Sequence, residues 1–232
     1  MDQIPGLPAL QLPPGAFRKA DPSPDAAFYA QPRFVTHIDD GAIAAVTALY
    51  RAFLPAGGDI LDLMSSWVSH LPPDVAYNSV TGHGMNRAEL DANGRLTARV
   101  VQDLNADPAL PFADAAFDGA GLCVSVQYLQ RPVEVFREVC RVLRPGAPLV
   151  VTFSNRCFPT KAVAIWQALD GPDQQRLVGA YLSAAGFDTV ELRAAVPRGG
   201  DPLWAVVGRA GSTAKDAAGE TPVSAGAGNL PS

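Results

Sequence analysis

Apolar residues between positions 59 and 209 occur in short, nearly continuous runs. Runs of this kind, bounded by glycine, proline and small polar residues, predict strands that are covered on both faces of a sheet. The clearest is "APLVVTFS", in which polar side chains appear only toward the end. The strands predicted in this way cover residues 59–64, 78–83, 96–103, 117–126, 147–154, 187–195 and 203–209.

Between these runs, apolar residues recur every three or four positions, which is the spacing of one face of a helix. Ile43, Val46 and Tyr50 form such a face, and Asp39 or Asp40 can cap the helix that carries them. The other predicted helices cover residues 86–93, 132–144, 160–169 and 173–185.

Strands that alternate with helices predict an α/β fold with a doubly wound, mostly parallel sheet. The last two predicted strands are joined by the short segment "PRGGDP", which favours an antiparallel pair at one edge. We therefore expect one Rossmann-like domain over residues 37–210, with a seven-stranded sheet and an antiparallel edge strand.

The two ends of the chain have a different composition from this domain. Residues 1–36 are rich in proline and carry several aromatic side chains, so we predict an extended arm that lies on the domain, as a lid over a pocket or as packing at a sheet edge. Residues 211–232 are small, polar and aperiodic, and we predict a disordered tail there.

Composition excludes several classes of function. The formal net charge of −5, without a basic run, does not favour nucleic acid as a partner. The first thirty residues lack the pattern of a secretion signal, and no apolar stretch is long enough to span a membrane. The three cysteines have no zinc-type spacing, which suits reduced thiols. These features predict a cytoplasmic protein.

A run of motifs between residues 100 and 155 is more specific. It contains "LPF" at 110–112, Asp114, "FD" at 117–118 and "RVLRPG" at 141–146. This run resembles the central motifs of class I S-adenosylmethionine-dependent methyltransferases, of the type 11-like kind that acts on small molecules. The resemblance implies the methyltransferase form of the Rossmann-like fold, S-adenosylmethionine as cofactor and a small molecule as methyl acceptor.

The resemblance also assigns cofactor residues. Asp103 matches the acid after the third strand that accepts a hydrogen bond from the adenine amino group, and Leu104 beside it matches an apolar wall for the ring. Ser125 and Gln127, after the fourth strand, match positions that line the methionine moiety and the acceptor pocket.

Two of the family's cofactor motifs are altered in this chain. The first normally reads "DLGxGxG", but here Asp62 is followed by "LMSSWV", so that Ser65, Ser66 and Trp67 replace bare backbone. The second normally ends "VxGxD" with an acid for the ribose hydroxyls, but here "VTGHG" follows the second strand and glycine stands in the acid's place. Asp62, Ser65, Ser66 and Gly82 are the cofactor-binding candidates in these two segments.

The acceptor side of the site is predicted from position in the fold. Asn155 and Arg156 follow the fifth strand, and Arg156 is suited to a carboxylate or phosphate, although a salt bridge would explain it equally well. Tyr29 and Arg33 lie on the arm and are further candidates for substrate contact. His37 or His83 is the candidate base that would accept a proton from the acceptor.

Three hypotheses for function therefore stand. The first is methyl transfer from S-adenosylmethionine to a small molecule. The second is a degenerate methyltransferase fold that binds a ligand or partner without transfer, which the two altered motifs favour. The third is a metal-dependent enzyme in which His37, His70, His83 and Asp39 meet, although their spacing matches no known metal motif.

Overall fold

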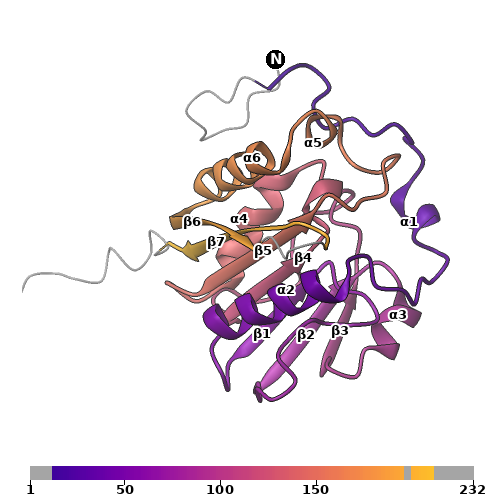
Figure 1. Ribbon diagram of the computed structural model, residues 1–232. Coiled ribbons are helices and arrows are strands. Elements are labelled where there is room, and N and C mark those ends of the chain that lie inside the picture. The colour runs from indigo at the N-terminus through magenta and orange to yellow at the C-terminus, as the bar shows by residue number, and fades with distance from the viewer. Residues whose placement is uncertain (1–11, 196–199, 212–232) are drawn as a thin grey trace, which may run out of the picture.

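The computed structural model describes residues 12–195 and 200–211. Within them, seven strands form one sheet with the order β3-β2-β1-β4-β5-β7-β6. The strands are β1 Asp59–Leu63, β2 Ser79–Gly84, β3 Ala98–Val101, β4 Gly119–Cys123, β5 Pro148–Ser154, β6 Phe187–Ala195 and β7 Leu203–Ala210. The helices are α1 Asp25–Phe28, α2 Asp40–Phe53, α3 Arg87–Ala92, α4 Pro132–Val142, α5 Ala164–Gln167 and α6 Gly171–Ala184, with a 3₁₀ turn at Val126–Tyr128 (Figure 1).

The pairing of the strands confirms the predicted fold class. Strands β1 to β5 pair in parallel, and β7 pairs antiparallel with both β5 and β6. The strand order reverses between β1 and β4, and the crevice beyond the carboxyl ends of the strands at such a point is where doubly wound sheets bind ligands.

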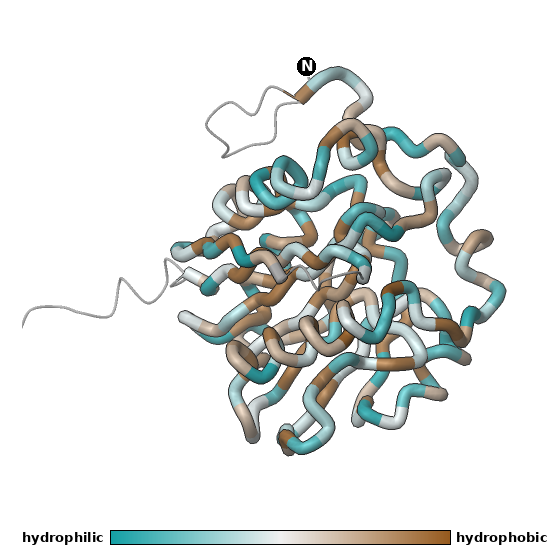
Figure 2. The backbone as a smooth tube through the Cα atoms, in the orientation of Figure 1, coloured by the Kyte–Doolittle hydropathy of each residue, from teal (hydrophilic) through white to brown (hydrophobic). Residues whose placement is uncertain are grey.

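Apolar side chains cover both faces of the sheet. Successive residues of a strand point to opposite faces, so Ile60 packs with Val46 and Tyr50 of α2, whereas Leu61 and Leu63 join the cluster on the other face. Figure 2 shows the resulting concentration of hydrophobic residues along the central strands. The rigid framework of the protein is this two-sided core, which fixes the strand ends around the crevice.

Helix α2 begins as its sequence predicts. The Asp39 carboxylate accepts a hydrogen bond from the Ala42 backbone N–H at 2.8 Å, which satisfies one of the free donors of the first turn. Three predicted elements are clearly shorter than expected, and one of them is β3, which covers Ala98–Val101 instead of residues 96–103. Strand β4 ends at Cys123 because Val124 has a φ of 42°, and the helix predicted over 160–169 is reduced to α5.

The crossover from β1 to β2 lacks the helix that usually joins parallel strands. Residues 64–78 are all described, and they form an ordered coil with no helix. The coil is held by the Thr47 hydroxyl, which donates to the His70 carbonyl at 3.0 Å, and by Arg95, which donates to the carbonyls of Pro72 and Val75 at 3.2 and 3.0 Å. No helix N-terminus therefore follows β1.

The N-terminal arm lies along the body of the domain (Figure 1, indigo). Its first described part pairs with the segment before α5: the Ala164 N–H donates to the Arg18 carbonyl and the Asp21 N–H to the Thr160 carbonyl, both at 2.9 Å. The next part reaches α3, where the Asn86 side chain donates to the Tyr29 carbonyl at 2.9 Å. Residues 1–11 of the arm and 212–232 of the predicted tail lie outside the described residues.

Candidate functional site

A cavity of about 320 Å³ lies where the strand order reverses, at the carboxyl ends of β1, β2 and β4. Its wall comes from the loops after these strands, the loop after β3, helix α2 and the N-terminal arm. Ligand pockets in proteins span roughly 300 to 1,000 Å³, so this cavity has room for one small molecule.

Asp62 stands at the end of β1 and forms part of the cavity wall. Its carboxylate accepts hydrogen bonds from the hydroxyls of Ser65, at 2.6 Å, and Ser69. Burial raises the pKa of Asp62, and the two hydroxyls oppose that rise. The two serines thus supply the polar partners that a buried carboxylate needs.

The segment after Asp62 crosses directly over the end of β2. Met64 adopts a left-handed φ of 53°, and the Ser65 N–H then donates to the His83 carbonyl at 2.6 Å. A Cβ atom placed on Gly84 would lie 2.4 Å from the Ser65 carbonyl oxygen. Residue 84 must therefore be glycine if this segment is to keep its course.

Trp67 fastens the arm to this segment. Its indole N–H donates to the Val35 carbonyl at 3.0 Å, and its ring meets the ring of Phe34 edge to face at 6.3 Å. The ring is half-buried and lines the cavity. Trp67 therefore covers the pocket together with the arm, and it does not turn into the core.

Glu89 on α3 joins the same two segments. One carboxylate oxygen accepts the Arg33 backbone N–H at 2.7 Å, and the other accepts the Ser66 hydroxyl at 2.6 Å. Asn93, at the end of α3, donates to the Ser66 carbonyl at 2.9 Å. The arm, the replaced loop and α3 are thus one hydrogen-bonded unit along one side of the cavity.

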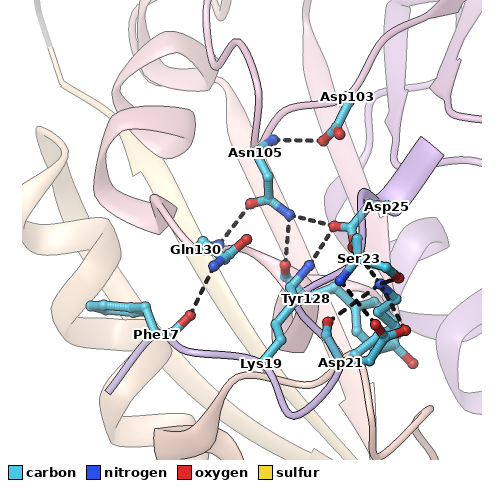
Figure 3. A network of polar contacts seen from close by, with 10 residues as sticks. Phe17, Lys19, Asp21, Ser23, Asp25, Asp103, Asn105, Tyr128 and Gln130 are labelled. Carbon is cyan, nitrogen blue, oxygen red and sulfur yellow. Dashed lines mark hydrogen bonds and ion pairs between the residues drawn. The ribbon is translucent and has the colours of Figure 1, made fainter. Parts of the chain in front are cut away.

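Asp103 and Leu104 line the cavity after β3. Asp103 also caps its own loop, because its carboxylate accepts the Asn105 N–H at 2.9 Å. The Asn105 side chain donates to Asp25 of the arm and to the Tyr128 carbonyl, both at 2.9 Å, as Figure 3 shows. The loop that carries Asp103 is therefore fixed by the arm.

The other cofactor candidates are placed differently. Ser125 lines the cavity, with its hydroxyl donated to the Cys123 carbonyl at 2.6 Å. Among the described residues, the cavity wall does not include Gln127, which is buried and donates to the Val124 carbonyl at 2.8 Å. Nor does it include Gly82, where a Cβ would meet Leu96 at 2.3 Å.

Gln127 is also an acceptor-side candidate, and three of these five candidates line the cavity. Tyr29 and Arg33 come from the arm, and the Arg33 guanidinium lies 4.5 Å from the centre of the Phe28 ring. Arg156 follows β5 and pairs with Asp201 at 2.7 Å, with 62% of its side chain exposed. Asn155 is exposed and lies outside the described cavity wall.

The three histidines all line the cavity in different surroundings. His37 meets the Phe158 ring edge to face at 5.3 Å, and desolvation lowers its pKa, as it lowers that of His70. Asp39 is engaged in capping α2. Over residues 12–195 and 200–211, no group of three or more His, Cys, Asp or Glu side chains is arranged to hold a metal ion.

His83 is the most deeply buried of these histidines, with 1% of its surface exposed. Burial lowers its pKa to about 4, although the side chain of Gln102 and its own backbone oppose the shift. Within the described part of the chain, neither ring nitrogen makes a hydrogen bond of regular geometry, although the Gln102 side chain is close enough to act on the ring. A neutral imidazole with two unused polar atoms therefore faces the cavity.

The low pKa of His83 predicts a pH dependence of stability. The unfolded chain takes up a proton near pH 6.5, whereas the folded chain does so only near pH 4. The unfolded state therefore binds more protons between these values, and stability falls as the pH drops through this window. We expect a loss of about 2 kcal/mol from this group between pH 7.5 and pH 5. Denaturant unfolding at both pH values should show it, and His83→Leu should remove that part of the slope; an unchanged slope in the variant would contradict the assignment.

Tyr50 lines the cavity, although the sequence predicted it only as part of an apolar helix face and not as a site residue. It belongs to the apolar face of α2, and its hydroxyl also has no hydrogen-bond partner among the described residues. Its ring passes over Gly121 of β4, where a Cβ would lie 2.7 Å from the hydroxyl oxygen. The glycine in the strand is the one signal that a large side chain approaches there.

Known methyltransferases resemble this region in sequence, and solved structures share the fold of the chain. A family model described as a methyltransferase domain matches residues 66–151. The malonyl-acyl-carrier-protein O-methyltransferase of Methylococcus capsulatus is 32% identical over 100 residues, 40% of this chain and 36% of that enzyme. The matched region thus spans about a third of the relative's length.

The chain has the fold of the S-adenosylmethionine-dependent methyltransferases, and its residues 66–151 match the methyltransferase domain family in sequence.

Solved structures with this fold include two methyltransferases and one cyclase. A methyltransferase from Aquifex aeolicus has a TM-score of 0.53 at 15% identity, over 80% of this chain and 97% of that one. Phosphoethanolamine N-methyltransferase 2 from Haemonchus contortus, in complex with S-adenosylmethionine, has a TM-score of 0.51 at 13% identity, over 71% of this chain and 52% of that one. The [4+2]-cyclase SpnF has a TM-score of 0.54 at 17% identity, over 81% of this chain and 91% of that one. These three likenesses establish the fold alone.

One arrangement of residues 64–66 and β2 accounts for both segments in which the sequence departs from the methyltransferase motifs that it resembles. The loop after β1 carries side chains where the family has glycines, and its Ser65 carbonyl fills the space beside residue 84. An acid at position 84 would collide with that carbonyl. Glu89 supplies a carboxylate on this side of the cavity, and it is bound to Ser66 and Arg33.

Proposed function

We propose that the chain binds S-adenosylmethionine in this cavity and transfers its methyl group to a small-molecule nucleophile. The observation that carries the proposal is the position of Asp62 and Asp103, the two acidic residues that match the family pattern, on the wall of one cavity at the strand reversal. When bound, the cofactor supplies an electrophilic methyl group on a sulfonium.

The residues present fit the polar parts of this cofactor. Asp103 would accept from the adenine amino group and Leu104 would cover the ring. Asp62, with Ser65 and Ser69, would face the amino-acid end. Buried polar atoms at His83 and Tyr50 have no hydrogen-bond partner among the described residues, which suits a polar ligand.

The chain's own contribution to transfer is to position the reactants and exclude water. Tyr29 and Arg33 of the arm, and His37 directly after it, line the cavity and close it on one side. His37 is the better candidate for the base, because the pKa of His83, about 4, makes that imidazole a weak proton acceptor. Desolvation lowers the pKa of His37, which keeps its ring neutral and able to accept a proton.

Calorimetric titration with S-adenosylmethionine and S-adenosylhomocysteine tests the proposal. Hydrogen bonds to charged groups contribute about 1.5 to 3 kcal/mol, so Asp103→Ala is expected to weaken binding by roughly 10- to 100-fold. Asp107→Ala is the matched control, because Asp107 caps the same loop through the Ala109 N–H at 3.0 Å but is not part of the described cavity wall. Binding that both variants retain equally would reject the cofactor role of Asp103.

A second candidate function is ligand binding, or another reaction, without methyl transfer. The crossing of the 64–66 segment over Gly84 favours it, because the space that family members use for the ribose acid is filled by backbone. The cyclase SpnF has the same fold. A folded protein that gives no heat with either S-adenosyl compound would support this second candidate over the first.

A further inference from the structure

His83 occupies an unusual position for a polar side chain. It is 1% exposed, it lines the cavity, and both of its ring nitrogens lack a hydrogen-bond partner among the residues that the structure describes. Buried polar groups in folded proteins are nearly always paired, and the exceptions commonly face a bound molecule or water. The unpaired nitrogens therefore point to a ligand.

The backbone at His83 is held by the neighbouring strands on both sides. His83 is paired in register with Leu63 on one side and Val100 on the other. Its carbonyl accepts the Ser65 N–H at 2.6 Å. Strand residues alternate between faces, so the side chain points away from the face on which Gly84 meets Ser65. The position from which the side chain enters the cavity is therefore set by the sheet before a ligand binds.

His83 lies at the same end of the cavity as the residues assigned to adenine. The Gly84 carbonyl, next to it in β2, accepts the Gln102 N–H at 3.0 Å, and Asp103 and Leu104 follow directly. All three, His83, Asp103 and Leu104, line the cavity. The ligand group that reaches His83 is thus the one that lies along Asp103.

We propose that His83 binds the nucleoside part of the ligand, as a neutral imidazole that donates one hydrogen bond and accepts another. This inference rests on the proposed function for the identity of the ligand. A neutral imidazole offers one donor and one acceptor, and a purine base with its ribose presents groups of both kinds. His83 would thereby compensate for the missing ribose acid. It would do so with an imidazole in place of a carboxylate, on the face of β2 opposite to that of residue 84. The lowered pKa agrees with this role, because it keeps the ring uncharged.

The test compares His83→Leu with the wild type by calorimetry, with S-adenosylhomocysteine and 5′-methylthioadenosine as probes. We expect at least a tenfold loss of affinity for both probes, because both carry the nucleoside. The melting temperature of the ligand-free variant should equal or exceed that of the wild type, since leucine removes two unpaired polar atoms from a buried site. His83→Gln, which keeps a donor and an acceptor, should recover part of the affinity.

Tyr77→Phe is the matched control. The Tyr77 hydroxyl is also buried without a partner among the described residues, but Tyr77 is not part of the described cavity wall, so this variant should leave both affinities unchanged. Equal affinity in wild type and His83→Leu would overturn the role of His83 and leave the proposed function standing. A wild type that binds neither probe would overturn both. Binding that depends on His83, with no methyl transfer to any acceptor, would support the role of His83 and count against the proposed function.

Discussion

Replacing Lys161 by methionine is expected to lower the free energy of unfolding by about 3 kcal/mol, because the change removes one partner from a buried set of charges. Lys161 is fully buried, with a side-chain exposure of 0%. Its ammonium group lies 3.1 Å from Asp21 and 3.4 Å from Asp25, and it donates to the Ser23 carbonyl at 2.7 Å.

The effect should reach the cavity through the arm. Asp25 also pairs with Lys19 and accepts from Asn105 at 2.9 Å, so the charged set joins the arm to the loop of Asp103 (Figure 3). The Ser23 hydroxyl and backbone, and then Lys161, lower the pKa of Asp21 to about 2, so that carboxylate stays ionised. Without Lys161, the arm loses its central contact to the segment before α5.

Denaturant unfolding measures the loss, and hydrogen exchange over residues 18–30 should become faster in the variant. Arg131→Met is the control, because Arg131 pairs with Glu134 on the exposed surface of α4 and such pairs contribute about 0 to 1 kcal/mol. A Lys161→Met protein as stable as the Arg131→Met protein would show that the buried set does not hold the arm.

Replacing Gly84 by aspartate puts back the family's ribose acid, and we expect it to damage the protein. The new Cβ would lie 2.4 Å from the Ser65 carbonyl oxygen and 3.2 Å from a methyl carbon of Leu90. Overpacking against backbone, together with a buried carboxylate, should cost about 3 kcal/mol of unfolding free energy. Affinity for S-adenosylhomocysteine should not increase.

Gly94→Asp is the matched substitution, since no atom lies within 4 Å of a Cβ at that glycine. Its stability should change by no more than about 0.5 kcal/mol, as at other surface positions. If Gly84→Asp were as stable as Gly94→Asp and bound S-adenosylhomocysteine more tightly than the wild type, the 64–66 segment would have to move easily. The glycine at position 84 would then not be a consequence of the changed loop after β1.

The sequence was sufficient for the fold, because the fold depends on local patterns. The apolar runs predict β1 and β5 from their own residues. In the same way, Asp39 predicts the start of a helix and the "RVLRPG" motif predicts the end of one. Boundaries were less certain at β4, where the left-handed φ of Val124 is a tertiary feature that no periodicity records.

The site was less predictable, because its contacts join segments far apart in the chain. The sequence showed that the glycines after β1 and the acid after β2 were both missing. It did not show that Ser65 lies on Gly84, which makes the second change a consequence of the first. Trp67 presented the same difficulty, since its partner is the Val35 carbonyl of the arm. Lys161 lies in a segment that its pattern predicted to be helical, and its burial depends on acidic residues about 140 positions away.

The central claim is that one cavity holds the cofactor between Asp62 and Asp103. A crystal structure of the protein with S-adenosylhomocysteine tests it most directly. We predict electron density in the cavity, with the adenine beside Asp103, Leu104 and His83, the amino-acid end toward Asp62, and the Ser65 N–H still bound to the His83 carbonyl. An empty cavity at saturating ligand, or the ligand bound elsewhere on the molecule, would contradict the claim.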